Sequence, residues 1–293
     1  MMRDRIARVA LATCADFPDL EAPERLVLDP LRDRGIEPVP AVWDDPSIDW
    51  SGFDLVVLRG TWDYAERLVE FMTWVRRADT VTTVLNPPEV VEWNTDKRYL
   101  AELARHDVPI VPTTFLAPHD APVLPTSGEY VVKPTVSAGS RDTARYLAGR
   151  DDAVASAHAE RLLAAGREVM VQPYVDTVDD HGETALLYLG GRFSHAIRKG
   201  PLLESGAAPT TELFAQETID PRIPTTADHA VGDAVMAHLT GRFGTLLYAR
   251  VDLLEGPDGP MVLEVELTEP SLFIQSDDGA PGRLADAISG RLG

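Results

Sequence analysis

The 293-residue sequence predicts an α/β protein whose C-terminal part is α+β. Over residues 1–92, apolar runs typical of buried parallel strands alternate with stretches of helical spacing, as in an open parallel sheet. Later in the chain, two pairs of apolar runs are joined by short turns, which is typical of antiparallel hairpins. We therefore expect an open parallel-sheet domain (1–92), a small central domain (93–172) and an antiparallel-sheet domain (173–293).

Strand and helix signals alternate along the first domain. Residues 54–58 (DLVVL) form a continuous apolar run, which is typical of a strand buried on both faces. Leu68, Phe71, Met72 and Val75 recur at helical spacing and predict an amphipathic helix. The expected strands are 8–13, 36–43, 54–58 and 81–85, and the expected helices are 23–34, 65–78 and 95–106.

The rest of the chain changes to hairpin patterns. Gly190 and Gly191 interrupt an apolar stretch and predict a two-residue turn between two strands within 184–197. A second hairpin is expected from strands 246–254 and 261–267. Strands 130–134 and 168–174 are expected to flank an Ala-rich helix at 152–165, and a further helix is expected at 225–240.

The charge balance excludes several classes of partner. The chain has 27 Lys+Arg against 47 Asp+Glu, a formal net charge of −20. It lacks the cationic surface that DNA, RNA and anionic membranes require, so we expect neither a nucleic-acid nor a membrane partner. The single Cys14 permits no internal disulfide, and the seven histidines show no metal-site spacing. We expect a cytoplasmic protein.

Three carboxylates near the C-terminus form a candidate metal site. Glu264 and Glu266 are two residues apart on one expected strand, so they share a face, and Asp252 lies on the strand before it. Converging carboxylates in an apolar setting repel one another unless a cation lies between them, and oxygen donors favour Mg²⁺. The alternative is a solvent-facing strand that carries ordinary glutamates.

Two lysines and a loop of small residues form a candidate phosphate site. Lys133 ends an apolar strand, and the loop that follows contains Ser137, Gly139 and Ser140, whose backbone N–H groups could approach a phosphate. Lys97, in the first turn of its expected helix, could reach the same phosphates. The alternative for each lysine is an ordinary surface position.

Further candidates lie at the ends of later strands. A strand that ends at Gln172 and Pro173 and continues through Tyr174 and Val175 could flank an adenine ring and bind its edge. Glu183 could then accept hydrogen bonds from a ribose. Three cations complete this group of candidates as catalytic residues: Arg198, Lys199 and Arg250, the last sharing a face with Asp252.

This ordered series resembles the ATP-grasp superfamily, in particular its glutathione-synthetase-like and ribosomal-protein glutamate-ligase-like branch. The resemblance covers nearly the whole chain and implies an ATP-grasp fold, in which ATP is held between two antiparallel sheets. It implies that Lys97 and Lys133 contact phosphates, that the backbone of 172–175 holds adenine, that Asp252, Glu264 and Glu266 bind Mg²⁺, and that Arg198 touches the γ-phosphate or acyl phosphate. One departure is Glu266, where the family commonly has Asn; it still supplies an oxygen ligand.

Several segments are also similar to the ATP-grasp cyclo-ligases that form D-cycloserine from O-ureido-D-serine. They are residues 59–64 (RGTWDY), 86–88 (NPP), 93–99 (WNTDKRY) and 264–273 (EVELTEPSLF). Residues 59–64 follow a buried strand at the carboxyl edge of the expected sheet, where Arg59 could bind a substrate carboxylate bidentately. The alternative is a loop that packs Trp62 for structural reasons. The expected substrate contacts are Arg59, Thr61, Trp62, Asp63, Tyr64, Glu269 and Ser271.

These resemblances imply an ATP- and Mg²⁺-dependent carboxylate–amine ligase that acts on a small-molecule carboxylate through an acyl phosphate. In the cyclising version the attacking nitrogen belongs to the same substrate, so ring closure benefits from proximity. Intermolecular ligation of glutathione-synthetase type, a kinase-like phosphotransfer and an ATP-binding module without catalysis are the alternatives. Loops 137–140 and 200–216 are expected to exclude water from the acyl phosphate. We also expect a homo-oligomer.

Overall fold

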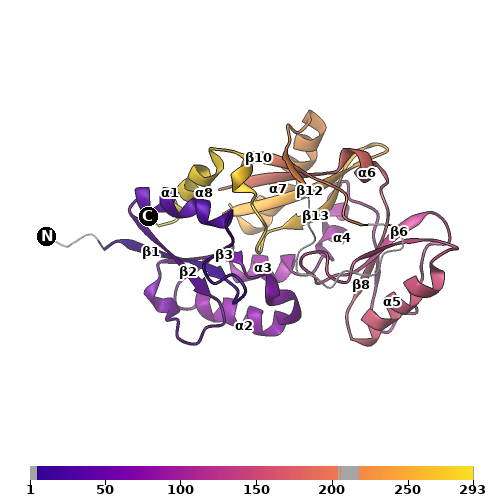
Figure 1. Cartoon of the computed structure of the whole chain (residues 1–293), viewed down its shortest axis with the longest axis horizontal. Helices are drawn as coiled ribbons and strands as arrows, with labels where there is room; N and C mark the ends of the chain where they lie inside the picture. Colours follow the sequence, from indigo (N-terminus) through magenta and orange to yellow (C-terminus); the bar gives the residue numbers. More distant parts are fainter. Residues whose placement is uncertain (1–4, 204, 206–217, 293) are drawn as a thin grey trace.

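Three β-sheets follow one another along the chain in the computed structural model, which describes residues 5–203, 205 and 218–292 (Figure 1). The N-terminal sheet has the strand order β2-β1-β3-β4, and all of its pairings are parallel. The predicted open parallel sheet is thus confirmed. Its strands are β1 (Ala7–Thr13), β2 (Ile36–Val42), β3 (Leu55–Gly60) and β4 (Thr83–Leu85).

Helices cover both faces of this sheet because alternate strand residues point to opposite sides. Leu11 of β1 packs in one core with Leu31 of α1 and Leu284 of α8, whereas Ala10 packs in another with Phe71 of α2. The C-terminal helix α8 therefore covers one face of the N-terminal sheet. The sequence did not predict this contact. The helices are α1 (Leu28–Asp33), α2 (Leu68–Asp79), α3 (Pro88–Asn94) and α8 (Ala280–Ser289), with 3₁₀ turns η1 (Glu24–Val27) and η3 (Trp62–Glu66).

The helix expected over 95–106 is wrong in its extent. The chain instead forms α3 and then α4 (Tyr99–Arg105), separated by residues 95–98. Pro88 occupies the first turn of α3, where its missing N–H group is tolerated. Between the helices, the Lys97 N–H donates to the Thr135 carbonyl at 3.0 Å, a tertiary contact that draws the chain away from one continuous helix.

The central sheet is antiparallel, with the order β5-β8-β6-β7, and α5 packs on it. Ala159 and Leu162 of α5 form one buried core with Tyr130 and Val171 of the sheet. The strands β5 and β7 were not predicted. The elements are β5 (Thr114–Leu116), β6 (Glu129–Pro134), β7 (Ala144–Leu147), β8 (Val169–Pro173) and α5 (Asp152–Ala164).

The C-terminal sheet has the order β11-β10-β9-β12-β13 and is antiparallel throughout. Both predicted hairpins are present, and Gly190 and Gly191 adopt positive φ angles of 58° and 76° at the first turn. Helix α7 begins with a capping box between Thr225 and Asp228. The elements are α6 (Thr177–His181), β9 (Glu183–Leu189), β10 (Arg192–Lys199), β11 (Ile219–Pro221), α7 (Thr226–Phe243), β12 (Tyr248–Gly256), β13 (Gly259–Glu266) and the 3₁₀ turn η4 (Ile274–Ser276).

The two faces of the C-terminal sheet differ in chemistry. Val251 on one face shares a core with α4 and α7, whereas Leu187 and Tyr248 on the other face pack with α8. Farther along that second face, Arg250 and Asp252 replace the apolar residues, so the sheet presents charge at this end. This charged end provides one wall of the cavity described below.

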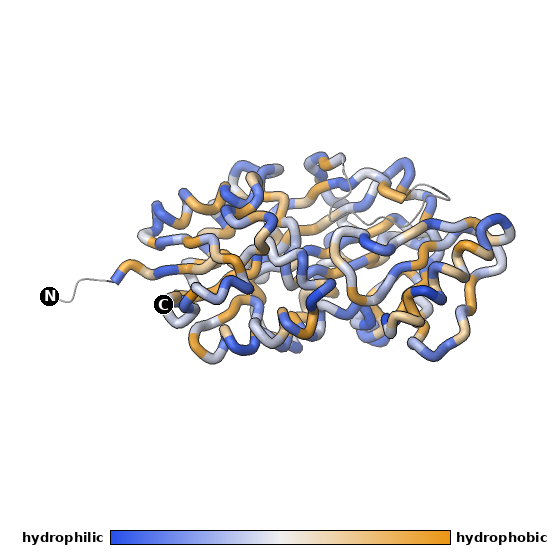
Figure 2. The backbone as a smooth tube through the Cα atoms, turned by 60° about the horizontal axis from the view of Figure 1, so that its bottom comes forward, coloured by the Kyte–Doolittle hydropathy of each residue, from blue (hydrophilic) through white to orange (hydrophobic). Residues whose placement is uncertain are grey.

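Hydrophobic and hydrophilic segments alternate along the backbone of the described residues, as Figure 2 shows. Among the described residues, no helix is both long enough and apolar enough to cross a membrane.

Candidate active site

A cavity of about 430 Å³ is lined by both antiparallel sheets and by loops of the N-terminal part. Its wall includes residues of β6, β8, β9, β10, β12 and β13, so segments far apart in the sequence meet there. Most of the predicted site residues line it: Trp62, Tyr64, Lys97, Lys133, Ser137, Gly139, Ser140, Gln172, Pro173, Tyr174, Val175, Glu183, Lys199, Arg250, Glu264, Glu266, Glu269 and Ser271.

Lys97 and Lys133 bring two ammonium groups to one part of the wall. The Lys97 Nζ donates to the Ser137 carbonyl at 2.9 Å and forms an ion pair with Glu264 at 3.0 Å. Lys133 is buried, and burial lowers its pKa, although the nearby Glu264 carboxylate acts in the opposite direction. Both lysines lie beside the loop that contains Ser140, so this part of the cavity is suited to an anion such as a phosphate chain.

The end of β8 forms another part of the wall. Gln172 donates from Nε2 to the Thr113 hydroxyl at 2.9 Å, which fixes its side chain in the central sheet. The Tyr174 N–H donates to the Glu129 carbonyl at 2.8 Å, so the backbone remains tied to β6 after the strand ends at Pro173. Val175 and Pro173 add apolar surface to the cavity, which suits a flat aromatic ring.

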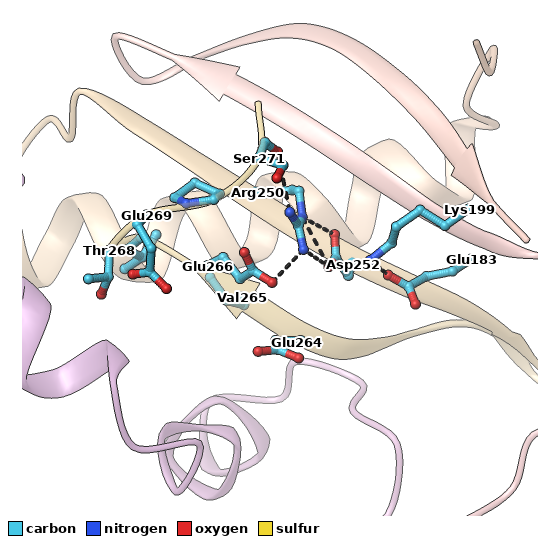
Figure 3. Close-up of polar contacts among 12 residues, drawn as sticks. Glu183, Lys199, Arg250, Asp252, Glu264, Val265, Glu266, Thr268, Glu269 and Ser271 are labelled. Carbon is cyan, nitrogen blue, oxygen red and sulfur yellow. Dashed lines mark hydrogen bonds and ion pairs between the residues drawn. The ribbon is translucent and has the colours of Figure 1, made fainter. Parts of the chain in front are cut away.

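A row of alternating charges crosses the C-terminal sheet (Figure 3). In the register of β12 and β13, Asp252 lies opposite Glu264 and Arg250 lies opposite Glu266, so the expected common face is confirmed. Asp252 accepts hydrogen bonds from Lys199 Nζ and Arg250 Nε, both at 2.9 Å. The row continues at both ends, because Arg250 also pairs with Glu266 and Lys199 with Glu183.

Burial and these cations set the pKa values of the carboxyl groups. Burial alone would raise the pKa of Asp252, but Arg250 and Lys199 hold it well below its usual range. Lys97 and Lys133 likewise lower the pKa of Glu264 against the effect of burial. For Glu266 burial prevails and raises the pKa despite Arg250. Side-chain cations therefore favour the anionic forms of Asp252 and Glu264 in a buried setting, whereas Glu266 is shifted toward its neutral form.

The three carboxylates of the expected magnesium site do not converge on a common point in this structure. Within the described part of the chain, no three Asp, Glu, His or Cys side chains are grouped so as to hold a metal ion. The carboxylates of Asp252, Glu264 and Glu266 instead face lysine and arginine side chains. Carboxylate oxygens are nevertheless the kind of donor that a hard divalent cation prefers. Binding would require that the ion replace side-chain cations at these carboxylates.

The whole chain is similar to a protein of known biosynthetic context. It is 42% identical over 298 residues to the cycloserine biosynthesis protein DcsG of Streptomyces lavendulae, and the match covers 97% of this chain and 96% of that protein. The chain belongs to the DcsG family. The family model for the N-terminal domain of D-cycloserine synthetase DcsG matches residues 9–86.

Solved structures agree with this assignment. The crystal structure of D-cycloserine synthetase DcsG superposes with a TM-score of 0.88 at 38% identity, covering 98% of this chain and 100% of that chain. A RimK domain ATP-grasp protein from Sphaerobacter thermophilus DSM 20745 superposes with a TM-score of 0.66 at 20% identity, covering 96% and 99%. The predicted ATP-grasp fold is confirmed, and this DcsG family member is an ATP-dependent ATP-grasp ligase.

The structure places Arg198 outside the cavity of this ligase. Neighbouring strand residues point to opposite faces, so Lys199 lines the cavity while Arg198 points away. The Arg198 guanidinium donates to the carbonyl groups of Asp180 and His181 at 3.0 and 2.8 Å. The contact predicted between Arg198 and the γ-phosphate thus finds no support in this placement, and Lys199 is the residue of that strand that brings a cation to the cavity.

Arg59 is also placed differently from the prediction. It is fully buried, at 0% exposure, and pairs with Glu24, to which its Nε donates at 2.7 Å. Its Nη2 donates to the Pro270 carbonyl at 3.2 Å. The guanidinium is therefore engaged inside the protein instead of facing a substrate carboxylate.

Two neighbours of Arg59 also have structural contacts. Thr61 is fully buried, and Asp63 accepts hydrogen bonds from Trp43 at 2.9 Å and Arg67 at 3.1 Å. Neither residue belongs to the described lining of the cavity, whereas Trp62 and Tyr64 do. The 59–64 segment therefore contributes two of its predicted substrate residues to the wall.

Six successive backbone carbonyl groups after β13 are held by side chains, a feature that the sequence analysis missed. Buried donors from three parts of the chain reach this segment, residues 267–272, which we name the clamped segment. The donor–acceptor pairs are Asn86–Leu267 (2.8 Å), Tyr248–Thr268 (2.8 Å), Trp62–Glu269 (3.1 Å), Arg59–Pro270 (3.2 Å), Arg250–Ser271 (3.2 Å) and His195–Leu272 (3.0 Å). The clamped segment is thus held rigidly beside the cavity.

Asn94 begins the same set of contacts. Its amide oxygen accepts from the Leu267 N–H at 2.7 Å, and its amide nitrogen donates to the Val265 carbonyl at 2.7 Å. The only sequence signal for Asn86 and Asn94 was their place in the segments similar to cyclo-ligases, because an asparagine that binds distant backbone has no local pattern.

The clamped segment carries Glu269 into the cavity wall. Glu269 is 8% exposed, and its Oε2 has no hydrogen-bond partner among the described residues. Burial, reinforced by the nearby Glu266, raises the pKa of Glu269 well above its usual range, while the charge of Lys97 and a hydrogen bond with Tyr64 act in the opposite direction.

Only the first of the two loops predicted to exclude water is fully described. Loop 137–140 lines the cavity. Much of the second predicted lid, 200–216, lies outside the described residues, which omit 204 and 206–217.

Proposed function

We propose that this ligase uses Mg-ATP to activate the carboxylate of O-ureido-D-serine and closes a ring within the same molecule to form D-cycloserine, in antibiotic biosynthesis. The observation that carries the proposal is the similarity to DcsG over 97% of the chain. A shared fold alone does not fix a substrate, but this similarity includes the segments that line the cavity.

The nucleotide is proposed to lie between the two antiparallel sheets. The backbone of 172–175 would hold adenine, and Glu183 would accept hydrogen bonds from the ribose. Lys97 and Lys133, with the loop that contains Ser137, Gly139 and Ser140, would hold the phosphates. Support comes from their common position on one cavity wall and from the acidity of the rest of the chain, which leaves few other places for a polyanion.

Asp252, Glu264 and Glu266 are the proposed ligands of Mg²⁺. Their carboxylates already require cations, which Lys97, Lys199 and Arg250 supply in this structure. Bound Mg²⁺ would offset charge on the phosphoryl group during its transfer. Lys199 and Arg250 would then be available to pair with phosphate oxygens.

The chain's residues would then bind, orient and shield the reacting groups. The substrate carboxylate attacks the γ-phosphorus of ATP, and ADP leaves. A nitrogen of the same substrate then attacks the acyl phosphate, and phosphate leaves, so no second amine site is needed. Atom balance requires that the carbamoyl group depart, with one water, as carbon dioxide and ammonia. Trp62 and Tyr64 would shape the substrate part of the cavity and exclude bulk water.

The test is an assay of the purified chain with Mg-ATP and O-ureido-D-serine. We expect ADP, phosphate and D-cycloserine in equal amounts, without any added amine. ADP formation that requires a second amino acid would indicate intermolecular ligation, and a stable phosphorylated product would indicate a kinase. Nucleotide binding without ADP formation across a panel of carboxylates would indicate a non-catalytic module. Each of these three results would overturn the proposal.

A further inference from the structure

The cavity is lined by several glutamates, most of which pair with a cation of the protein. The pairs are Glu183 with Lys199, Glu264 with Lys97, Glu266 with Arg250, and Glu24 with Arg59.

Glu269 differs from these paired glutamates. Its Oε2 has no hydrogen-bond partner among the described residues, although the side chain is only 8% exposed. A buried carboxyl oxygen without a partner is unfavourable, because it loses water without gaining a replacement. The position is therefore suited to a ligand that donates hydrogen bonds, and a cationic donor would make the strongest ones.

The backbone around Glu269 is held in place. Trp62 Nε1 donates to the Glu269 carbonyl at 3.1 Å, and Tyr248 and Arg59 hold the carbonyl groups on either side. These hydrogen bonds fix the backbone from which the Glu269 side chain extends. Figure 3 shows the Glu269 carboxyl group on the same side of the sheet as those of Glu264 and Glu266. Glu269 lines the same cavity as Lys97 of the proposed phosphate site, and the charge of Lys97 acts on the Glu269 carboxyl group.

We propose that Glu269 binds the ammonium group of an amino-acid substrate whose carboxylate is activated in the adjoining part of the cavity. This proposal rests on the proposed function and narrows its substrate range. Glu269 then selects zwitterionic amino acids over carboxylates that lack an amine. Tyr64, whose hydroxyl is hydrogen-bonded to the Glu269 carboxyl, is its positioning residue.

Glu21 is the competing candidate. It also lines the cavity, but it is only half-buried, so water screens its charge. A buried carboxylate prefers a cationic ligand over a neutral one more strongly than a solvent-exposed carboxylate does. Glu21→Gln therefore belongs in the same experiment.

The test compares O-ureido-D-serine with 3-(ureidooxy)propanoate, in which hydrogen replaces the amino group. The measured quantity is the ratio of the two kcat/KM values for ADP formation. We expect the wild-type enzyme to prefer the amino acid by roughly 10- to 100-fold. Glu269→Gln should remove this preference while the KM for ATP stays unchanged. Glu255→Gln, at an exposed residue outside the cavity, is the matched control and should keep it.

Three results would overturn the proposal: equal use of both substrates by the wild-type enzyme, a preference that survives Glu269→Gln, or a preference lost in Glu21→Gln instead. The comparison in the wild-type enzyme does not depend on whether the variant folds. Absence of ADP with either substrate would refute the proposed function itself, which separates that failure from a failure of the Glu269 assignment alone.

Discussion

The Glu24–Arg59 pair offers a decisive test, because its two proposed roles make opposite predictions. As a substrate ligand, Arg59 would have to leave Glu24, whereas as a structural cation it stays paired. Glu24 is 3% exposed and Arg59 is 0% exposed, so neither charge is offset by water. The perturbation is a cycle of Glu24→Gln, Arg59→Met and the double variant.

The magnitude follows from the burial of the pair. Removing one partner leaves a buried charge uncompensated, which lowers the free energy of unfolding by about 3–5 kcal/mol. In the double variant both charges are absent, so the loss should be well below the sum of the single losses. What remains is mainly the loss of the hydrogen bond to Pro270, at about 1 kcal/mol. We therefore expect a coupling free energy of at least about 2 kcal/mol.

Urea unfolding measures the cycle, with unchanged m-values as the check that the unfolding transition is comparable. ADP formation with O-ureido-D-serine is measured on the same proteins. Single-variant losses that add within about 0.5 kcal/mol would refute the reasoning. So would a lower substrate KM in Glu24→Gln, because that result would mean that a freed Arg59 binds the substrate carboxylate.

Three further predictions follow from the site and the central domain. Glu264→Gln should lower Mg²⁺-dependent ADP formation at least about 100-fold, with Glu255→Gln as the exposed control, and equal rates would contradict the metal assignment. Lys133→Met should raise the KM for ATP at least about tenfold without lowering the urea midpoint, because burial already disfavours the ammonium; a lower midpoint would argue against this. His158, buried beside Tyr146, has a pKa lowered by burial to about 4, below the value near 6.5 of an unfolded histidine. The unfolded state then binds more protons between these values, so stability should fall as pH drops from 6.5 to 4, by at most about 1.4 kcal/mol per pH unit. His158→Gln should flatten this slope in urea titrations, and an unchanged slope would show that other groups cause it.

Local patterns were sufficient for several elements and site residues. The Gly190 and Gly191 turn was predictable because two positive φ angles are easily adopted only by glycine. The common face of Glu264 and Glu266 followed from strand alternation alone. The exit of β8 through Gln172 and Pro173 followed from the missing N–H group of proline, although the strand was expected to extend to residue 174.

Other features depended on contacts between distant segments. The face of Arg198 depended on where its strand began, and a shift of one residue exchanges the two faces. Arg59 looked like a substrate ligand because no local pattern could show that Glu24, 35 residues earlier, would reach it. Helix α8 was missed, although Leu284 and Ile288 are spaced as on one helix face.

The sequence by itself determined the chemistry that this protein has available: a strongly acidic chain, a few cations at strand ends, and carboxylates alternating along a C-terminal strand. Only the tertiary structure decided how those groups are paired, because ion pairs and hydrogen bonds depend on distances between segments that are separated in the chain. The clamped segment shows this most clearly, since the donors that hold its carbonyl groups come from residues 59, 62, 86, 195, 248 and 250. Folding brings these donors together, and so leaves Glu269 without a partner of its own for Oε2 among the described residues.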